Sequence, residues 1–173
     1  ELATVTKIDV FPHILPKKYF DRMIQVAPSG MALQKRMSGI PVLIDLELRL
    51  KIMDRYDGYV QVLTLSNPPI EVVGGKDVSP DLARLANDEM AAIVAKHPDR
   101  FPGFVASLPM NNPDAAVREI DRAFDNLPRR QGEADAGEEA QHGVVGPRDL
   151  GYEFGDALVA HERLRALDGR VRD

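Results

Sequence analysis

The feature that most constrains the fold of this chain is an alternation of short apolar segments with segments of helical periodicity. Three apolar runs have the length and the β-branched content of buried strands: residues 7–11, 59–65 and 101–108. Apolar residues three and four apart predict helices between and after them, at residues 17–24, 45–58, 79–97 and 113–124. This alternation favours right-handed βαβ units, so we predict an α/β fold with a parallel sheet and functional loops after the strands.

Local signals support individual boundaries. Ser79, Pro80 and Asp81 supply a cap residue, a proline for the first helical position and an acid for the first turn, so they predict the start of a helix. Pro12 cannot donate to a strand ladder, and we expect the first strand to stop there. Two prolines and two glycines between residues 28 and 41 predict a loop.

Composition excludes several classes of function. The 173 residues include no cysteine, so disulfides and thiolate ligands are excluded and a metal would have to bind His, Asp or Glu. The balance of 22 basic to 27 acidic residues argues against nucleic acid as a partner. The sequence lacks a run of 18 apolar residues and a signal-peptide pattern, so we expect no membrane association and a cytoplasmic location.

The chain changes character after residue 127. Residues 1–127 contain eight arginines and seven lysines, whereas residues 128–173 contain seven arginines and no lysine. The polar run 129–143 predicts a solvated linker, and residues 156–168 have the spacing of one amphipathic helix. We therefore predict one domain at 1–127 and a divergent tail at 128–173. The change in composition suggests the hypothesis that the tail derives from a shifted reading frame or an unrelated junction.

Four local patterns carry a resemblance to a known family. They are IDVFPHILP at residues 8–16, DLELRLKIMD at 45–54, the segment 87–104 ending in HPDRFPGF, and LPMNNPDAA at 108–116. Their order and spacing resemble the decarboxylase-like branch of the amidohydrolase superfamily (amidohydrolase-2, aminocarboxymuconate-semialdehyde decarboxylase-like), over residues 7–127. The resemblance implies the first three βα units of a TIM (β/α)₈ barrel that is cut short, because a whole barrel needs about 200 to 250 residues.

The resemblance also implies a divalent metal, zinc or manganese, at the mouth of the barrel. In this family two ligands come from an H-x-H pair on the first strand, whose side chains face the same side. His13 aligns with the second histidine of the pair, whereas Phe11 stands in place of the first and cannot ligate a metal. The family's mid-barrel histidine and last-strand aspartate have no assignable counterpart. His13 is thus the candidate metal ligand, and the alternative is a capping or surface histidine.

Two further residues are candidates for substrate binding. Arg49 aligns with an arginine that, by the resemblance, clamps a substrate carboxylate with its bidentate fork. The alternative for Arg49 is a surface ion pair with Asp45, one helical turn away. Asn67 follows the second predicted strand and could contact a substrate, although an asparagine before two prolines is also typical of a turn. The sequence assigns no catalytic acid or base.

The resemblance implies a metal-dependent carboxy-lyase or hydrolase that acts on a small carboxylated aromatic or muconate-like compound. The alternative is a catalytically incompetent barrel fragment that persists by oligomerisation, because part of a barrel leaves sheet edges and an apolar face uncovered. We expect a small molecule as the substrate and a homo-oligomer as the assembly.

Overall fold

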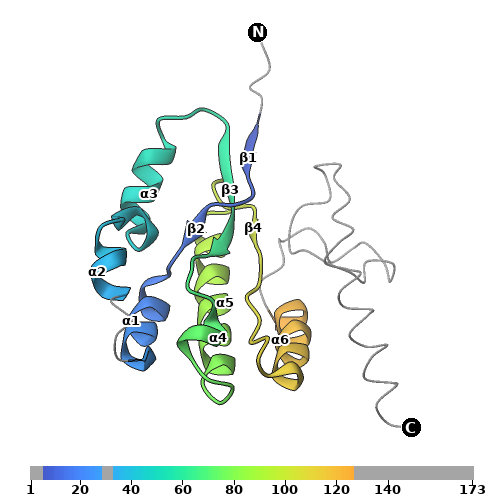
Figure 1. Ribbon diagram of the computed structural model, residues 1–173. Helices are drawn as coiled ribbons and strands as arrows, with labels where there is room; N and C mark the ends of the chain where they lie inside the picture. Colours follow the sequence, from blue (N-terminus) through green and yellow to red (C-terminus); the bar gives the residue numbers. More distant parts are fainter. Residues whose placement is uncertain (1–5, 29–32, 127–173) are drawn as a thin grey trace, which may run out of the picture. The chain divides into compact units, whose positions relative to one another are not determined.

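The computed structural model describes residues 6–28 and 33–126, which form a parallel sheet accompanied by helices (Figure 1). The longest strand, β3 (Tyr59–Leu65), pairs with each of the others. Its first residues pair with β1 (Lys7–Asp9) and its last with β2 (His13–Ile14), while its middle pairs with β4 (Gly103–Phe104). All these pairs are parallel, so the prediction of an α/β fold with a parallel sheet is confirmed.

The helices connect the strands in the order that the sequence predicts. Between β2 and β3 lie α1 (Lys17–Val26), α2 (Leu33–Ser38), the 3-10 turn η1 (Pro41–Leu43) and α3 (Leu46–Met53). Between β3 and β4 lie α4 (Ile70–Val73) and α5 (Ser79–Lys96), and α6 (Pro113–Asn126) follows β4. Figure 1 shows α3 and α6 on either side of α5.

The hydrophobic core lies between the sheet and these three helices. Met53 of α3, Met90 of α5 and Ala123 of α6 are buried in one cluster with Leu63 of β3. A second buried cluster joins α1, α2, η1, α4 and α5. Burial of these side chains removes apolar surface from water, which holds the helices on one face of the sheet. On the opposite face, Val105 is 53% exposed.

The first strand ends at Asp9, two residues earlier than predicted, and pairing with β3 resumes after Pro12, which was not predicted. Asp9 is the partner of Gln61 and His13 is the partner of Thr64, so four residue steps lie opposite three. The extra residue makes a β-bulge, after which β2 continues along the same edge of β3. Pro12 lies inside this bulge, where the lack of an N–H costs no ladder hydrogen bond.

Other elements differ from prediction mainly in their bounds. The strand at 59–65 and the helix from Ser79 are confirmed. The segment 28–41 is not all loop, because it contains α2 and the start of η1. The helix predicted to reach Gly58 ends at Met53, and Gly58 has a φ of 69° in the turn that follows. The third strand is shorter than predicted and spans Gly103–Phe104.

Ser79 begins α5 but does not cap it. Val78 occupies the cap position, and the Ser79 hydroxyl instead donates to Oδ1 of Asn111, in the segment before α6. The serine is fully buried, so its hydroxyl needs this partner within the protein. Ser79 therefore ties the start of α5 to the segment that follows β4.

The predicted tail lies outside the described residues. Residues 127–173, which include the expected linker and the expected helix at 156–168, are not described, and the division into a domain and a tail stays a prediction.

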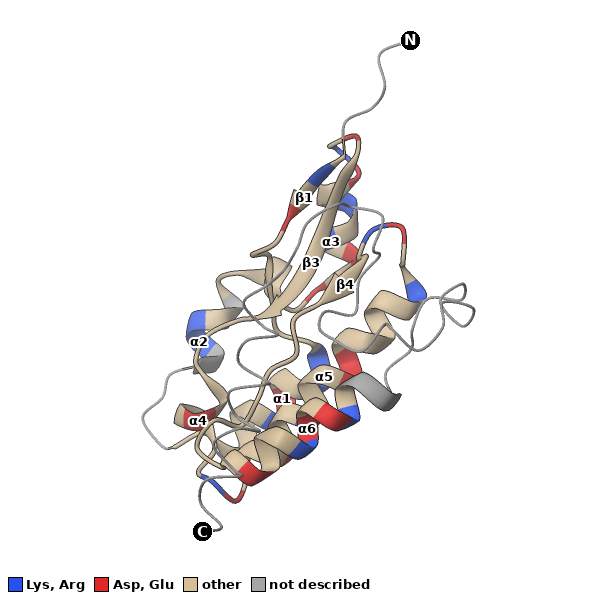
Figure 2. Ribbon diagram, turned by 90° about the vertical axis from the view of Figure 1, so that its right-hand side faces the viewer, with Lys and Arg blue, Asp and Glu red and all other residues tan. Residues whose placement is uncertain are grey.

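The described surface carries charges of both signs. Figure 2 shows acidic and basic residues interspersed along α5 and α6, while β3 has no charged residue. Of the helices in the described ranges, none combines the length and the hydrophobicity needed to cross a membrane.

Candidate functional site

Two of the predicted site residues lie toward the carboxyl ends of neighbouring strands. His13 lies on β2 beside Thr64 of β3, and its ring Nδ1 is 3.2 Å from the Thr64 hydroxyl oxygen. Asn67 follows the end of β3 and is exposed. In a parallel sheet the carboxyl ends of neighbouring strands lie at the same edge, so His13 and Asn67 occupy the position where such folds bind ligands.

Phe11 lies directly beside His13. The centroids of the two rings are 4.4 Å apart, and Phe11 is 72% exposed. The structure thus brings together the two positions that resemble the family's H-x-H pair, but one of the two carries no ligand atom. Asp9, the nearest acid along the strand, accepts hydrogen bonds from the Phe11 N–H and the Tyr59 hydroxyl.

The described residues do not by themselves fit a divalent metal. They contain no group of three or more His, Asp or Glu side chains placed to hold an ion. His13 is the one member of the predicted set present at this edge, and a single imidazole is a weak metal site, since such ions take four or more ligands. No chemical step in the described part of the chain can therefore be assigned to a metal.

Arg49 lies inside the protein, on the α3 side of the sheet. It is 4% exposed, so the alternative of an exposed pair with Asp45 does not apply. Its Nη1 donates to Oε1 of Gln61 at 2.8 Å, and its Nη2 donates to the backbone carbonyls of His13 and, at 3.2 Å, Val42. Burial lowers the pKa of Arg49, and the nearby Tyr59 and Asp9 oppose that shift. The carboxylate clamp stays a prediction: Nη1 and Nη2 are engaged by protein oxygens, whereas the buried Nε has no hydrogen-bond partner among the described residues.

A cavity of about 380 Å³ lies beside Arg49. Its lining includes Lys7 of β1, Tyr59 and Gln61 of β3, and Tyr56 after α3. His13 and Asn67 do not line it. The cavity is thus separate from the edge of the sheet that carries the candidate site.

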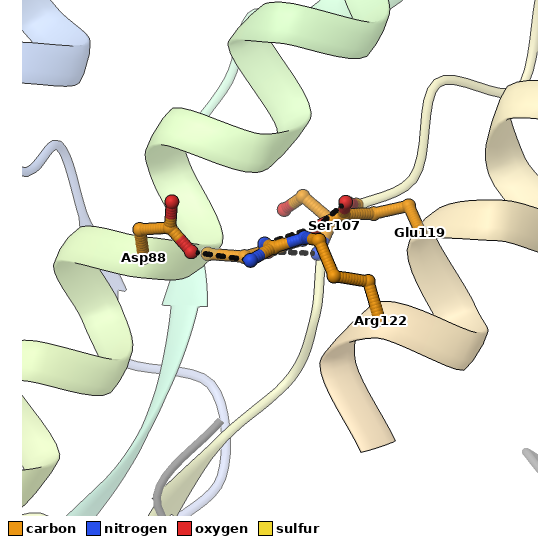
Figure 3. Close-up of polar contacts among 5 residues, drawn as sticks. Asp88, Ser107, Glu119 and Arg122 are labelled. Carbon is orange, nitrogen blue, oxygen red and sulfur yellow. Dashed lines mark hydrogen bonds and ion pairs between the residues drawn. The ribbon is translucent and has the colours of Figure 1, made fainter. Parts of the chain in front are cut away.

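Sequence reasoning missed a polar network on the other side of β3. The fully buried Asn87 of α5 donates to the Ser107 carbonyl at 3.0 Å, accepts from the Ser107 N–H at 2.8 Å, and donates to Glu119 at 2.8 Å. Arg122 bridges Glu119 and Asp88, as Figure 3 shows. The network fixes the segment that follows the carboxyl end of β4. His13 lies near the same, carboxyl, ends of the strands, but on the opposite flank of β3. Only the pair of Glu119 and Arg122, three positions apart on α6, is local; the partners of Asn87 and Asp88 lie 20 to 34 positions away, where no local pattern marks them.

Comparisons with known proteins place this geometry in context. No family model matches the chain. Over 86 residues the chain is 41% identical to a γ-resorcylate decarboxylase from Rhodococcus jostii (strain RHA1). This match covers 49% of this chain and 26% of that protein. A γ-resorcylate decarboxylase from Rhizobium sp. (strain MTP-10005) is 38% identical over 86 residues, again 26% of its length. The chain therefore spans about a quarter of the length of the curated relatives that it matches.

Solved structures agree with the sequence matches. The crystal structure of 2,6-dihydroxybenzoate decarboxylase from Rhizobium matches with a TM-score of 0.53 and 31% identity, over 70% of this chain and 36% of that one. The dihydroxybenzoic acid decarboxylase from Polaromonas sp. JS666, solved with bound manganese and the inhibitor 2-nitroresorcinol, matches with a TM-score of 0.54 and 29% identity. It is likewise covered over 36% of its length. The chain is thus similar, over 49% of its length in sequence and 70% in structure, to the N-terminal part of these decarboxylases, which confirms the resemblance to the decarboxylase-like amidohydrolases carried by its motifs.

Proposed function

We propose that this chain contributes the first-strand side of a carboxy-lyase site for a small carboxylated aromatic compound, within a (β/α)₈ barrel completed by residues outside the described ones. The observation that carries the proposal is the placement of His13 and Asn67 at the carboxyl ends of neighbouring parallel strands. In barrel enzymes this is the catalytic face. The decarboxylase names of the relatives favour a carboxy-lyase over a hydrolase.

The reaction sets requirements that divide between described and undescribed residues. Decarboxylation breaks the bond between the aromatic ring and the carboxylate, releases CO₂, and leaves a ring carbon that must take up a proton from an acid. Asn67 is available to hold a polar group of the substrate. Arg49 can clamp the carboxylate with both Nη atoms only if they exchange their internal oxygen partners for the substrate, whereas its Nε has no partner to give up. The proton donor lies outside the described residues in this proposal.

A divalent metal, zinc or manganese, is part of the same proposal. His13 is its ligand from the first strand, because the Nδ1 contact with Thr64 leaves Nε2 available. The remaining ligands must come from outside the described residues, which contain no group of three or more side chains suited to an ion. The manganese in the solved Polaromonas relative supports a metal of this class.

Exposed apolar side chains favour a second candidate function. Val10, Phe11 and Val105 are 51%, 72% and 53% exposed. Val105 donates its N–H to Leu63 and so continues β4 beside the carboxyl end of β3. Apolar surface of this kind favours contact with another protein surface. In this alternative the chain is a catalytically incompetent barrel fragment that persists by homo-oligomerisation.

One experiment separates the two candidates. Elemental analysis of the purified 173-residue chain measures bound zinc and manganese, while light scattering of the same sample measures its assembly. His13→Gln should lower the metal content per chain, because it removes the proposed imidazole ligand. The matched control is His97→Gln, since His97 lies at the end of α5, near the opposite ends of the strands.

Each result has a direct meaning. Stoichiometric metal that is lost in His13→Gln and retained in His97→Gln supports the carboxy-lyase site. Metal that is retained in His13→Gln removes His13 from the site. A metal-free oligomer in the wild-type chain rejects the carboxy-lyase proposal for this chain and supports the incompetent fragment.

A further inference from the structure

We propose that Arg49 is a positioning residue. Through a chain of hydrogen bonds that is buried at Arg49 and Gln61 and joins the two ends of the bulge, it fixes where the rings of Phe11 and His13 stand on the other side of the sheet. We call the five residues of this chain, Asp9, Tyr59, Gln61, Arg49 and His13, the Asp9–His13 chain.

The Asp9–His13 chain is continuous. The Tyr59 hydroxyl donates to Oδ2 of Asp9 at 2.7 Å and accepts from Nε2 of Gln61 at 3.0 Å. Oε1 of Gln61 accepts from Nη1 of Arg49 at 2.8 Å, and Nη2 of Arg49 donates to the backbone carbonyl of His13. Every link is a direct hydrogen bond, and hydrogen bonds joined in such a series strengthen one another.

The end residues of the Asp9–His13 chain are also the residues that flank the bulge. Asp9 is the last residue of β1, and its Oδ1 also accepts the N–H of Phe11 at 3.0 Å. His13 is the first residue of β2, where its carbonyl meets Arg49 and its ring meets Thr64. A bulge lacks part of the regular ladder, so its conformation depends on such side-chain contacts. The chain supplies them on the α3 side, while the Phe11 ring is exposed on the other.

The chemistry of the contacts requires an arginine. Nη1 and Nη2 of Arg49 donate in different directions, to a side-chain amide and to the carbonyls of His13 and Val42. A planar guanidinium presents several donors in fixed directions, whereas a lysine ammonium is a compact point charge. The partners that Arg49 meets here are carbonyl and amide oxygens, and a buried cation with neutral partners is costly. A residue kept at such a cost points to a geometric task.

The inference rests on the proposed function in one respect: His13 belongs to the proposed carboxy-lyase site, and Phe11 lies beside it. Its test needs neither metal nor substrate, so the two can fail separately. In the full chain treated with a chelator, NMR records the ring-proton shifts of His13, assigned by their loss in His13→Gln. Phe11→Leu defines how much of these shifts comes from the ring current of Phe11, whose centroid is 4.4 Å away.

Arg49→Lys keeps the charge and removes the fork. We expect it to move the His13 ring-proton shifts toward their values in Phe11→Leu, because the two rings lose their fixed arrangement. Arg122→Lys is the matched control, since Arg122 also makes several hydrogen bonds but lies on α6. It should leave the His13 shifts unchanged.

Unchanged His13 shifts in a folded Arg49→Lys chain would overturn the proposal. If Arg49→Lys does not fold, Tyr59→Phe replaces it, because it removes one oxygen atom from the middle of the Asp9–His13 chain. A displacement of the His13 shifts in Tyr59→Phe then supports the inference, and unaltered shifts reject it.

Discussion

Two polar networks, each with a buried centre, hold the two sides of β3 in different ways. On the β1 and β2 side, Arg49 is 4% exposed and donates to amide and carbonyl oxygens. On the β4 side, Arg122 has a side chain that is 21% exposed and pairs with the carboxylates of Glu119 and Asp88. Burial lowers the pKa of Arg49, whereas the hydrogen bond from Arg122 to Glu119 raises the pKa of Arg122.

The difference shows that an arginine can hold a strand end by geometry or by charge. The charge of Arg49 loses its hydration and meets no carboxylate directly, so its value lies in where its donors point. The charge of Arg122 is compensated by its partners, but part of that attraction is screened by solvent and salt. Three predictions sharpen this contrast, beginning with the one of largest effect.

The buried end of the β4-side network should be the most sensitive point. Asn87→Ala leaves the N–H and carbonyl of Ser107 without a protein partner and removes one donor from Glu119. Unpaired buried polar groups are costly, so we expect the free energy of unfolding to fall by about 3 kcal/mol in urea denaturation. Asn67→Ala, at an exposed asparagine, is the control and should change it by less than about 0.5 kcal/mol. Equal effects in the two variants would contradict a holding role for Asn87.

Alkaline pH should weaken the Asp9–His13 chain through Tyr59. Burial raises the pKa of Tyr59, and its hydrogen bond to Asp9 raises it further. Above the ordinary tyrosine pKa of about 10, the unfolded chain loses this proton while folded Tyr59 keeps it, so stability falls as pH rises. Tyr59→Phe should therefore lose less unfolding free energy than the wild type between about pH 8 and pH 11.

A second tyrosine provides the control for this pH dependence. Burial raises the pKa of Tyr19 on α1 to about 12, so Tyr19 contributes a loss of the same sign over the same range. Tyr19→Phe should remove that contribution, and the effects of the two substitutions should add because the tyrosines belong to different contacts. If the unfolding free energy of Tyr59→Phe has the same pH dependence as that of the wild type, the ionisation of Tyr59 does not affect the stability of the protein.

Salt should produce the smallest effect, on Arg122 alone. Raising sodium chloride from about 0.1 M to 1 M screens partly exposed ion pairs. The difference in unfolding free energy between the wild type and Arg122→Gln should shrink by about 0.5 kcal/mol. The corresponding difference for Arg49→Gln should stay constant, because Arg49 is buried among neutral acceptors. A salt effect of equal size on both would erase the distinction between the networks.

The fold was predictable where local signals agree. The apolar run at 59–65 is bounded by Gly58 and by a serine and two prolines, and it forms β3 with the predicted bounds. Pro80 and Asp81 mark the start of α5 in the same local way. The bulge was not predictable, because Pro12 signals the end of a strand and only the register against β3 shows that the strand continues.

The adjacency of Phe11 and His13 was predictable from the sequence, whereas the surroundings of Arg49 were not. The motif at residues 8–16 places Phe11 and His13 side by side, as the structure does. Around Arg49, in contrast, apolar residues occupy every side of α3, so no periodicity shows which way the arginine faces. Its acceptors come from His13 and Gln61, at sequence separations of 36 and 12, which a local pattern cannot reveal.

The bulge shifts the phase of the first strand. In a regular strand, residues four apart face the same side, yet Asp9 pairs with buried Gln61 while His13 pairs with Thr64, which faces the other way. Deletion of one residue between Asp9 and His13 would make the alternation of side chains regular across both strands. The histidine side chain would then face α3. A substitution, such as phenylalanine at position 11, leaves the phase intact. Evolution can therefore alter or abolish the chemistry at this edge of the sheet while the packing around β3 is retained.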